Sequence, residues 1–182
     1  NFSKPLHGFG STTHLSILDN NGNAVSMTTT NGEGCGAIIP EYGIMMNNML
    51  GEYDLNPFGF HKWGTKRRLP TMMSPTIITK DSKPQYILGS GGSNRIRSAN
   101  IQVILNLLLN KMSLSNAVDA PRIHLEGNTL FHEPGINIPC DKLKNIIINS
   151  FNDKNLFFGG VNAVSPNSAV GDSRRGGHGI IS

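Results

Sequence analysis

The sequence TTHLSILDNNGNAVSMTTT, residues 12–30, decides the fold of the N-terminal side of the chain. Residues 13–18 and 24–30 are β-prone runs in which apolar and polar side chains partly alternate. The segment DNNGN between them, residues 19–23, is a strong turn signal. These features predict an antiparallel hairpin.

The register of this hairpin determines which side chains meet at its open end. If the turn centres on Asn21, opposite residues have numbers that sum to 42, and Thr30 faces Thr12. A two-residue loop of Asn21 and Gly22 would place Asn31 opposite Thr12 instead. Either register brings Thr12 beside Thr30 and Asn31.

The rest of the chain carries both strand and helix signals. We expect a buried helix at about residues 95–109, because its run IQVILNLLL, residues 101–109, is apolar nearly all round. Residues 47–70 form a long loop that carries the only tryptophan, which favours an ordered lid. The other expected elements are a strand at 43–46, a hairpin of 75–79 with 85–89, a helix from Ser113 to Ala120, a third helix that begins at Asp141, and a final hairpin of 158–164 with 168–172. This order indicates an α+β fold in which antiparallel sheet is layered with helices.

Composition excludes several classes of protein. The 182 residues are 37% hydrophobic, which is enough for one globular unit with its own core. There is no run of about 18 apolar residues for a membrane span, so we expect a soluble protein without a membrane partner, and the compartment, cytoplasmic or periplasmic, stays open. The net charge of +4 is modest and the basic residues are dispersed, which argues against a nucleic-acid partner.

The cysteines and histidines do not form a pattern of metal ligands. Cys35 and Cys140 have neither CxxC spacing nor a nearby histidine pair, so we expect no metal and interpret both as packed thiols. His14, on the first strand, is interpreted as a structural hydrogen-bonding group rather than a base. His61, His124 and His132 are scattered along the sequence and do not indicate a metal site.

Thr12 is the strongest candidate for a catalytic residue. A threonine hydroxyl is a weak nucleophile unless a base lies beside it, and the residue's own α-amine becomes that base when the preceding peptide bond is cut. The glycine-bearing lead to Ser11 supplies a plausible junction, and the hydroxyl of Thr30 is placed to orient the nucleophile. The alternative is that both threonines simply occupy exposed strand positions, which β-propensity favours.

The sequence GSGGSN, residues 89–94, is a second candidate site. It links a strand to a helix N-terminus, where converging N–H groups suit a phosphate or a tetrahedral oxyanion. It lacks the GK[ST] ending of a P-loop and the GxGxxG pattern of dinucleotide folds, so a tight turn without a ligand is an equal alternative. In the long loop, Glu52 and Asp54 are candidates to bind a substrate ammonium group, although loop carboxylates are commonly just solvated.

Six motifs follow one another along the chain: TTHLS (12–16), DNNGNAVSMTTT (19–30), GIMMNNM (43–49), MSPTI (73–77), GSGGSNRI (89–96) and AVDAPRIH (117–124). Together they resemble the small subunit of γ-glutamyltranspeptidases, densely from residue 10 to residue 126 and more loosely in the tail at 172–177. The resemblance implies an N-terminal-nucleophile hydrolase, an αββα sandwich of the α+β class, of which this chain is the small-subunit part only. It also implies that residues 1–11 are the end of the large-subunit region or a linker and that residues 12–182 are the small-subunit catalytic domain.

The resemblance implies a reaction as well. Thr12 would first attack the carbonyl carbon of Ser11 in an N-to-O acyl shift and so become a new N-terminus. Its hydroxyl would then attack the γ-glutamyl amide of glutathione or a similar compound, with its own amine as base. Water would release glutamate from the resulting ester, or an acceptor amine would take the γ-glutamyl group. Thr30 would support the nucleophile, Gly91 and Gly92 would form the oxyanion hole, and neither a metal nor an organic cofactor is implied.

The substrate-binding positions depart from the family pattern. Asn31 follows Thr30 directly, whereas the family has its asparagine two positions after the second threonine. Glu52 aligns with an aspartate that binds the substrate amine. Thr71 and Met72 align with a serine pair that binds the α-carboxylate, and a thioether cannot replace a hydroxyl donor.

The alignment also leaves open where the oxyanion hole lies. The family's glycine pair aligns without gaps to Gly92 and Ser93, and Gly91 with Gly92 is the alternative placement. The acyl-transfer machinery is therefore better supported by the sequence than the identity of the donor.

The resemblance finally implies a partner. The family's large subunit completes the sandwich and supplies an arginine to the substrate carboxylate, and it is absent here except for residues 1–11. We therefore expect a heterodimer with the large subunit of the same precursor, a small-molecule γ-glutamyl substrate, and little activity in the uncut chain alone. Two alternatives stay open: another N-terminal-threonine amidohydrolase, or a non-catalytic or unprocessed companion domain of the same fold.

Overall fold

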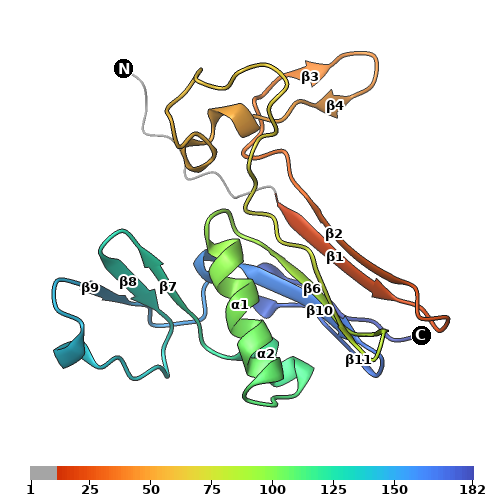
Figure 1. The fold of residues 1–182 in the computed structure, drawn as a ribbon, viewed down its shortest axis with the longest axis vertical. Helices are drawn as coiled ribbons and strands as arrows, with labels where there is room; N and C mark the ends of the chain where they lie inside the picture. The colour runs from red at the N-terminus through yellow and green to blue at the C-terminus, as the bar shows by residue number, and fades with distance from the viewer. Residues whose placement is uncertain (1–11) are drawn as a thin grey trace.

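A computed structural model describes residues 12–182, so the expected large-subunit end at residues 1–11 lies outside the described range. The fold is α+β, as the sequence predicts (Figure 1). Its strands are β1 (Thr13–Leu18), β2 (Ala24–Thr29), β3 (Ile38–Ile39), β4 (Ile44–Met45), β5 (Thr76–Lys80), β6 (Lys83–Gly91), β7 (Ile123–Glu126), β8 (Thr129–His132), β9 (Ile147–Ser150), β10 (Gly160–Ser165) and β11 (Ser168–Val170). Its helices are α1 (Arg95–Leu108) and α2 (Leu114–Asp119), and 3₁₀ turns occur at Met49–Gly51, Tyr53–Leu55, Cys140–Lys142, Leu156–Phe158 and Ser173–Arg175.

A central antiparallel sheet organises the molecule into three layers. Its strand order is β11-β10-β6-β5. Helices α1 and α2 pack against one face of this sheet, and the β1–β2 hairpin lies along the other (Figure 1). The side chains of β6 alternate accordingly: Leu88 belongs to the core under the helices, whereas a Cβ on Gly89 would collide with the ring of His14 in the hairpin.

The space between the helices and the sheet is the hydrophobic core. Leu88, Val103 and Val161 are completely buried there, and they pack with small residues of both layers, such as Ala99 and Ala163. At roughly 25 cal/mol per Å² of apolar surface removed from water, this layer is the main source of stability within the chain.

Helix α1 occurs where the sequence predicts it, but the expectation that it is buried all round is wrong. Ile101 and Leu105 are 51% and 41% exposed. The sheet covers only one side of the helix, so within residues 12–182 the apolar residues on its other side stay in contact with solvent.

The hairpin has the register whose residue numbers sum to 42, because Thr13 pairs with Thr29. The second register, with Asn31 opposite Thr12, is therefore wrong. The pairing extends one step beyond the strands, where Thr12 and Thr30 lie side by side. The local turn sequence thus places two threonine hydroxyls at the open end of the hairpin.

The two faces of the hairpin differ in polarity. On the inner face, the hydroxyl of Ser16 donates to the carbonyl of Asn162, and that of Ser26 donates to the carbonyl of Leu88. The outer face is apolar, and four of its side chains are 45–46% exposed: Leu15, Ile17, Val25 and Met27. The hairpin is therefore held to the sheet by polar contacts, and its apolar surface points away from the rest of the chain.

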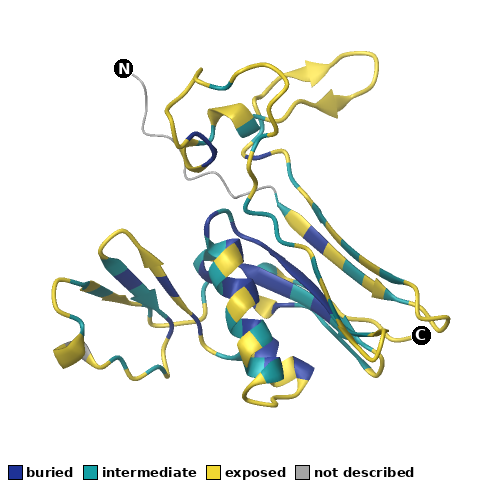
Figure 2. Cartoon of the chain, viewed as in Figure 1, coloured by how far each residue is buried: buried dark blue, intermediate teal, exposed yellow. Residues whose placement is uncertain are grey.

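A segment that we call the arm, residues 31–73, projects from the end of the hairpin (Figure 1). It contains β3 and β4, the latter close to the strand expected at 43–46. The expected ordered loop is tied together by Asn56, which accepts the indole N–H of Trp63 at 3.0 Å and donates to the carbonyls of Leu50 and Glu52. Most of the arm is nevertheless exposed (Figure 2).

Two sequence-based expectations fail in the outer parts of the molecule. The segment after Asp141 is not a third helix, because Cys140–Lys142 forms only a 3₁₀ turn and β9 then pairs in parallel with β8. The consecutive β-branched isoleucines of this segment favour a strand, and the edge of β8 offers them hydrogen-bond partners. Cys35 lies on the exposed arm and is not a packed thiol, while the side chain of Cys140 lies outside what the structure describes. No helix within residues 12–182 has the length and hydropathy of a membrane span.

Candidate active site

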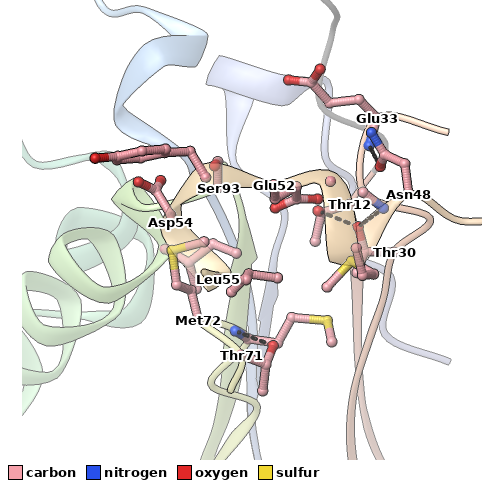
Figure 3. Close-up of a pocket in the computed structure, with 16 residues that line it drawn as sticks. Thr12, Thr30, Glu33, Asn48, Glu52, Asp54, Leu55, Thr71, Met72 and Ser93 are labelled. Atoms are coloured by element: carbon pink, nitrogen blue, oxygen red, sulfur yellow. Dashed lines mark hydrogen bonds between the residues drawn. The ribbon is translucent and has the colours of Figure 1, made fainter. Parts of the chain in front are cut away.

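Two threonines meet at the end of the hairpin. Thr12 Oγ1 donates a hydrogen bond to Thr30 Oγ1 at 2.8 Å (Figure 3). Thr30 Oγ1 also accepts the backbone N–H of Gly32 at 3.0 Å, which fixes its position. Both threonines are half-buried. A hydroxyl held this way can orient a second hydroxyl for nucleophilic attack.

A cavity of about 250 Å³ opens beside Thr12. Six residues that the sequence predicts as catalytic or substrate-binding line it: Thr12, Thr30, Glu52, Thr71, Met72 and Ser93. Asn31 does not line it, and its backbone carbonyl instead accepts the N–H groups of Gly34 and Asn48. The structure therefore gathers most of the predicted residues in one place and gives Asn31 a structural position beside them.

The predicted oxyanion turn lies directly behind Thr12. Gly91 is the last residue of β6, and a Cβ there would collide with the carbonyl oxygen of Thr12. Gly92 has φ +135°, and a Cβ on it would lie 2.8 Å from the Cα of Gly159. Both positions therefore require glycine, since only glycine permits this backbone approach and conformation. Ser93, with φ 55°, reaches the cavity just before α1 begins.

The cavity carries negative charge. Glu33, Glu52 and Asp54 all line it, and among residues 12–182 no lysine or arginine lines it. Burial, and then the nearby charges of Glu33 and Asp54, raise the pKa of Glu52. A cationic group bound there would relieve this repulsion, so the cavity favours a substrate ammonium over a substrate carboxylate.

Part of the lining is apolar. Met72, Met73, Leu55 and Ile96 contribute to it (Figure 3 labels Met72 and Leu55). Thr71 Oγ1 accepts the N–H of Met73 at 3.1 Å, so its own O–H is free to point elsewhere. Of the two positions predicted to bind a carboxylate, Thr71 retains a hydroxyl donor and Met72 does not.

Asn48 is a structural residue of the site to which sequence reasoning assigned no role. Its Oδ1 accepts the N–H of Glu33 at 2.7 Å, and its own N–H donates to the carbonyl of Asn31 at 3.2 Å. A Cβ on Gly32 would collide with both Asn48 Oδ1 and Glu52 Oε1. The asparagine pair in GIMMNNM was the available signal, because loop asparagines commonly hydrogen-bond to the backbone.

His14 is buried and both of its ring nitrogens form hydrogen bonds within the hairpin. It is 5% exposed, and its ring nitrogens lie 2.7 Å from Thr28 Oγ1 and 2.9 Å from Ser16 Oγ. Because Ser16 donates its proton to Asn162, the ring donates to Ser16 through Nε2 and accepts from Thr28 through Nδ1. Burial lowers the pKa of His14 to about 4, so the ring is neutral near pH 7. No group of three or more metal-binding side chains occurs in the part of the chain that the structure describes.

Comparison with known proteins adds to this geometry. A family model described as gamma-glutamyltranspeptidase matches residues 3–181. The glutathione hydrolase proenzyme of Bacillus subtilis (strain 168) is 34% identical over an alignment of 182 positions. The alignment covers 94% of this chain and 31% of that protein. The chain thus spans less than a third of the length of this curated relative.

Solved structures of transpeptidases have the same fold as this chain. The gamma-glutamyltranspeptidase from Pseudomonas nitroreducens complexed with L-DON superimposes with a TM-score of 0.76 at 27% identity, over 93% of this chain and 99% of that chain. The transpeptidase enzyme CapD of Bacillus anthracis superimposes with a TM-score of 0.73 at 28% identity, over 93% and 99% of the two chains.

Proposed function

The chain belongs to the γ-glutamyltranspeptidase family, and from this premise we propose that it carries the nucleophile of an enzyme that transfers or hydrolyses γ-glutamyl groups. The expected N-terminal-nucleophile hydrolase fold is confirmed by the solved relatives. The observation that carries the functional proposal is the 2.8 Å hydrogen bond between Thr12 and Thr30 at the edge of the cavity.

The first proposed step is self-cleavage. Thr12 Oγ1 attacks the carbonyl carbon of Ser11, and the peptide C–N bond breaks as an ester forms on the threonine oxygen. Water then hydrolyses this ester, which leaves a carboxyl group on Ser11 and a free α-amine on Thr12. Thr30 supports this step by holding the hydroxyl of Thr12 in place.

In the second step the freed amine of Thr12 acts as base while Thr12 Oγ1 attacks a γ-glutamyl carbonyl. The tetrahedral oxyanion is stabilised by backbone N–H groups of the turn, from Gly91 and Gly92 or from Gly92 and Ser93. The amine or peptide leaving group departs with a proton, and a γ-glutamyl ester remains on Thr12. Water or an acceptor amine then releases the acyl group.

We place the substrate ammonium beside Glu52, where Glu33 and Asp54 add to the negative potential. The hydroxyl of Thr71 is the remaining donor for the α-carboxylate at the position that the family fills with two serines. Glutathione and related γ-glutamyl compounds are the proposed donors, and Met72 sets this cavity apart from the family pattern.

We further propose that the active form is a heterodimer. The chain spans 31% of a relative whose name is that of a proenzyme, and the solved P. nitroreducens chain is covered to 99% by this one. Both facts support a division of the precursor into two chains. The exposed apolar side chains of the hairpin are a surface that a second chain can cover.

The test is to co-express this chain with its upstream coding region, measure the intact mass of the smaller product, and assay release of p-nitroaniline from γ-glutamyl-p-nitroanilide. A product that begins at Thr12, with activity that disappears in Thr12→Ala, supports the proposal. Thr13→Ala is the matched control, because Thr13 is exposed on β1 and should leave both steps intact. Cleavage at another bond, or unchanged activity in Thr12→Ala, would exclude Thr12 as the nucleophile.

Thr30→Val gives a second test of the same site. Valine keeps the shape of threonine and removes the hydroxyl that accepts the hydrogen bond from Thr12. We expect both self-cleavage and turnover to slow while the hairpin still folds.

A further inference from the structure

Ser90 occupies an unusual position beside the oxyanion turn. It is completely buried, and its hydroxyl accepts the backbone N–H of Gly160 at 3.0 Å and donates to the carbonyl of Gly91 at 2.7 Å. In the ladder between β6 and β10, Gly91 lies opposite Gly160. The serine hydroxyl therefore bridges the two strands at the point where β6 ends and the glycine turn begins.

The bonded carbonyl belongs to a peptide unit with a second polar group. The C=O of Gly91 and the N–H of Gly92 lie in one plane and point in opposite directions. A hydrogen bond that holds this C=O also fixes the direction of the Gly92 N–H. Gly92 is common to both placements of the oxyanion hole, so this N–H is needed in either case.

The residues on both sides of this peptide are glycines. Glycine leaves the flanking torsions free of restraint from a side chain of its own. Packing at Gly91 comes from Thr12, and packing at Gly92 from the backbone of Gly159 and the side chain of Arg175. Preorganised donors contribute to catalysis because they need not reorient as charge develops, so a bond that removes this freedom has a functional consequence.

The surroundings of Ser90 are built around its hydroxyl. A Cβ on Gly159 would lie 2.9 Å from Ser90 Oγ and 3.0 Å from the Gly91 carbonyl oxygen, so a side chain there would disturb this hydrogen bond. The preceding carbonyl, that of Phe158, accepts a hydrogen bond from the buried guanidinium of Arg122 at 3.2 Å. The turn that leads into β10, the strand that anchors Ser90, is thus itself held by a buried side chain.

Ser90 lies on the helix side of the sheet and does not line the cavity. A polar atom in such a place costs free energy unless it is hydrogen-bonded, and alanine would fill the space without that cost. We propose that Ser90 is a positioning residue: its hydroxyl holds the Gly91–Gly92 peptide so that the Gly92 N–H faces the developing oxyanion on the substrate. This inference rests on the proposed function and names a residue that acts through the turn without touching substrate.

The test uses the complete precursor and its cleaved product, with Ser90→Ala compared with wild type for kcat and KM on γ-glutamyl-p-nitroanilide. We expect kcat to fall about 10-fold to 100-fold while KM stays within about twofold, because the lost contribution is made in the transition state. Ser98→Ala is the matched control, since Ser98 on α1 also uses its hydroxyl in a hydrogen bond, to His124 Nδ1 at 2.8 Å, but away from the turn. Its kcat should match wild type.

Two further measurements keep the outcomes distinct. If Ser90→Ala yields no folded enzyme, Ser90→Cys replaces it, because a thiol fills a similar space and is a weaker donor, and an intermediate loss of kcat is expected. A kcat equal to wild type in either variant, or a loss shared equally with Ser98→Ala, overturns the positioning role. If wild type is active and Thr12→Ala is not, such a result leaves the proposed function standing; a wild type that is never cut at Thr12 removes both.

Discussion

Two apolar β surfaces of this molecule differ in burial: one is covered by helices and the other is exposed to solvent. On the helix side of the central sheet, Leu88 and Val161 are completely buried under α1 and α2. On the outer face of the hairpin, Leu15 and Val25 are each 45% exposed. Figure 2 shows the contrast, with the central strands buried and the arm and the hairpin edge open. Within residues 12–182 the first surface is covered by other elements, and the second is not.

The cavity of the candidate active site lies where these regions meet. Thr12 and Thr30 come from the end of the hairpin, Ser93 and Ile96 from the start of α1, and the remaining lining residues from the arm. The start of α1 therefore supplies one part of the lining, whereas most of the lining belongs to the exposed arm. This division explains why a chain with all the proposed chemistry is expected to need a second chain, and it can be tested by comparing substitutions in the two regions.

The largest effect is expected in the covered region, at the buried ion pair of Arg122 and Asp172. Their side chains are 2% and 1% exposed, and Arg122 Nη2 lies 2.6 Å from Asp172 Oδ2. Asp172→Asn removes the carboxylate that pairs with Arg122 and also contacts Arg174 at 3.3 Å, so we expect a loss of about 3–5 kcal/mol in the free energy of unfolding. Urea denaturation of the processed enzyme measures it.

The matched control for this substitution is Asp119→Asn. Asp119 pairs with Lys154 at the surface, where the two side chains are 60% and 39% exposed. Exposed pairs contribute about 0–1 kcal/mol. Similar losses in the two variants would show that the covered region does not depend on its buried charges.

The next effect concerns the core itself. Leu88→Ala removes a completely buried side chain from between the sheet and the helices, and such cavities cost about 3–4 kcal/mol. Leu109→Ala, at a side chain that is 71% exposed just after α1, should cost under about 0.5 kcal/mol. Unfolding midpoints of both variants check the difference, and a small loss in Leu88→Ala would mean that the core tolerates the cavity.

A third prediction concerns His14, which lies on the polar inner face of the hairpin, between the hairpin and the central sheet. Burial lowers the pKa of His14 from 6.5 to about 4, so between these values the unfolded chain binds a proton that the folded chain does not. The stabilising contribution of neutral His14 is complete above pH 6.5 and is lost as the pH falls to 4. The total is about 3 kcal/mol.

The measurement is the free energy of unfolding at several pH values between 4 and 7, for wild type and His14→Gln. Carboxylates titrate in both proteins, so the difference between the two curves isolates the histidine. A pH-independent difference would show that the ring is not held in its neutral form.

Local determinants explain which parts of this comparison could be predicted. The turn sequence around Asn21 predicts the hairpin and leaves two registers open, and either register brings Thr12 beside Thr30; the structure has the one in which Thr13 pairs with Thr29. The glycine turn was also recognisable, since a strand, two glycines and a helix follow one another in the sequence. The cavity as a whole could not be predicted from the sequence, because its walls come from segments as far apart as Glu33 and Ile96.

Burial is harder to predict than secondary structure. Alternation shows that Leu15 and Ile17 share a face of the strand, but it does not show whether another element covers that face. The same reason accounts for the error about α1, whose C-terminal half is strongly apolar although residues 12–182 cover only one side of the helix. The role of Ser90 could not be predicted from the sequence, because its hydrogen-bond donor, the N–H of Gly160, lies 70 residues away along the chain.

The smallest effect is expected on the outer face of the hairpin, and it depends on what covers that face. In this chain by itself, Leu15→Ala should cost about 1 kcal/mol or less, because the side chain is 45% exposed. If the rest of the precursor covers the hairpin, the same substitution in the assembled enzyme must cost more, approaching the value for Leu88→Ala. Denaturation of both forms measures the two costs. Equal small losses would mean that this face stays open in the enzyme, and the apolar surface of the hairpin would then not be the contact that joins the two chains.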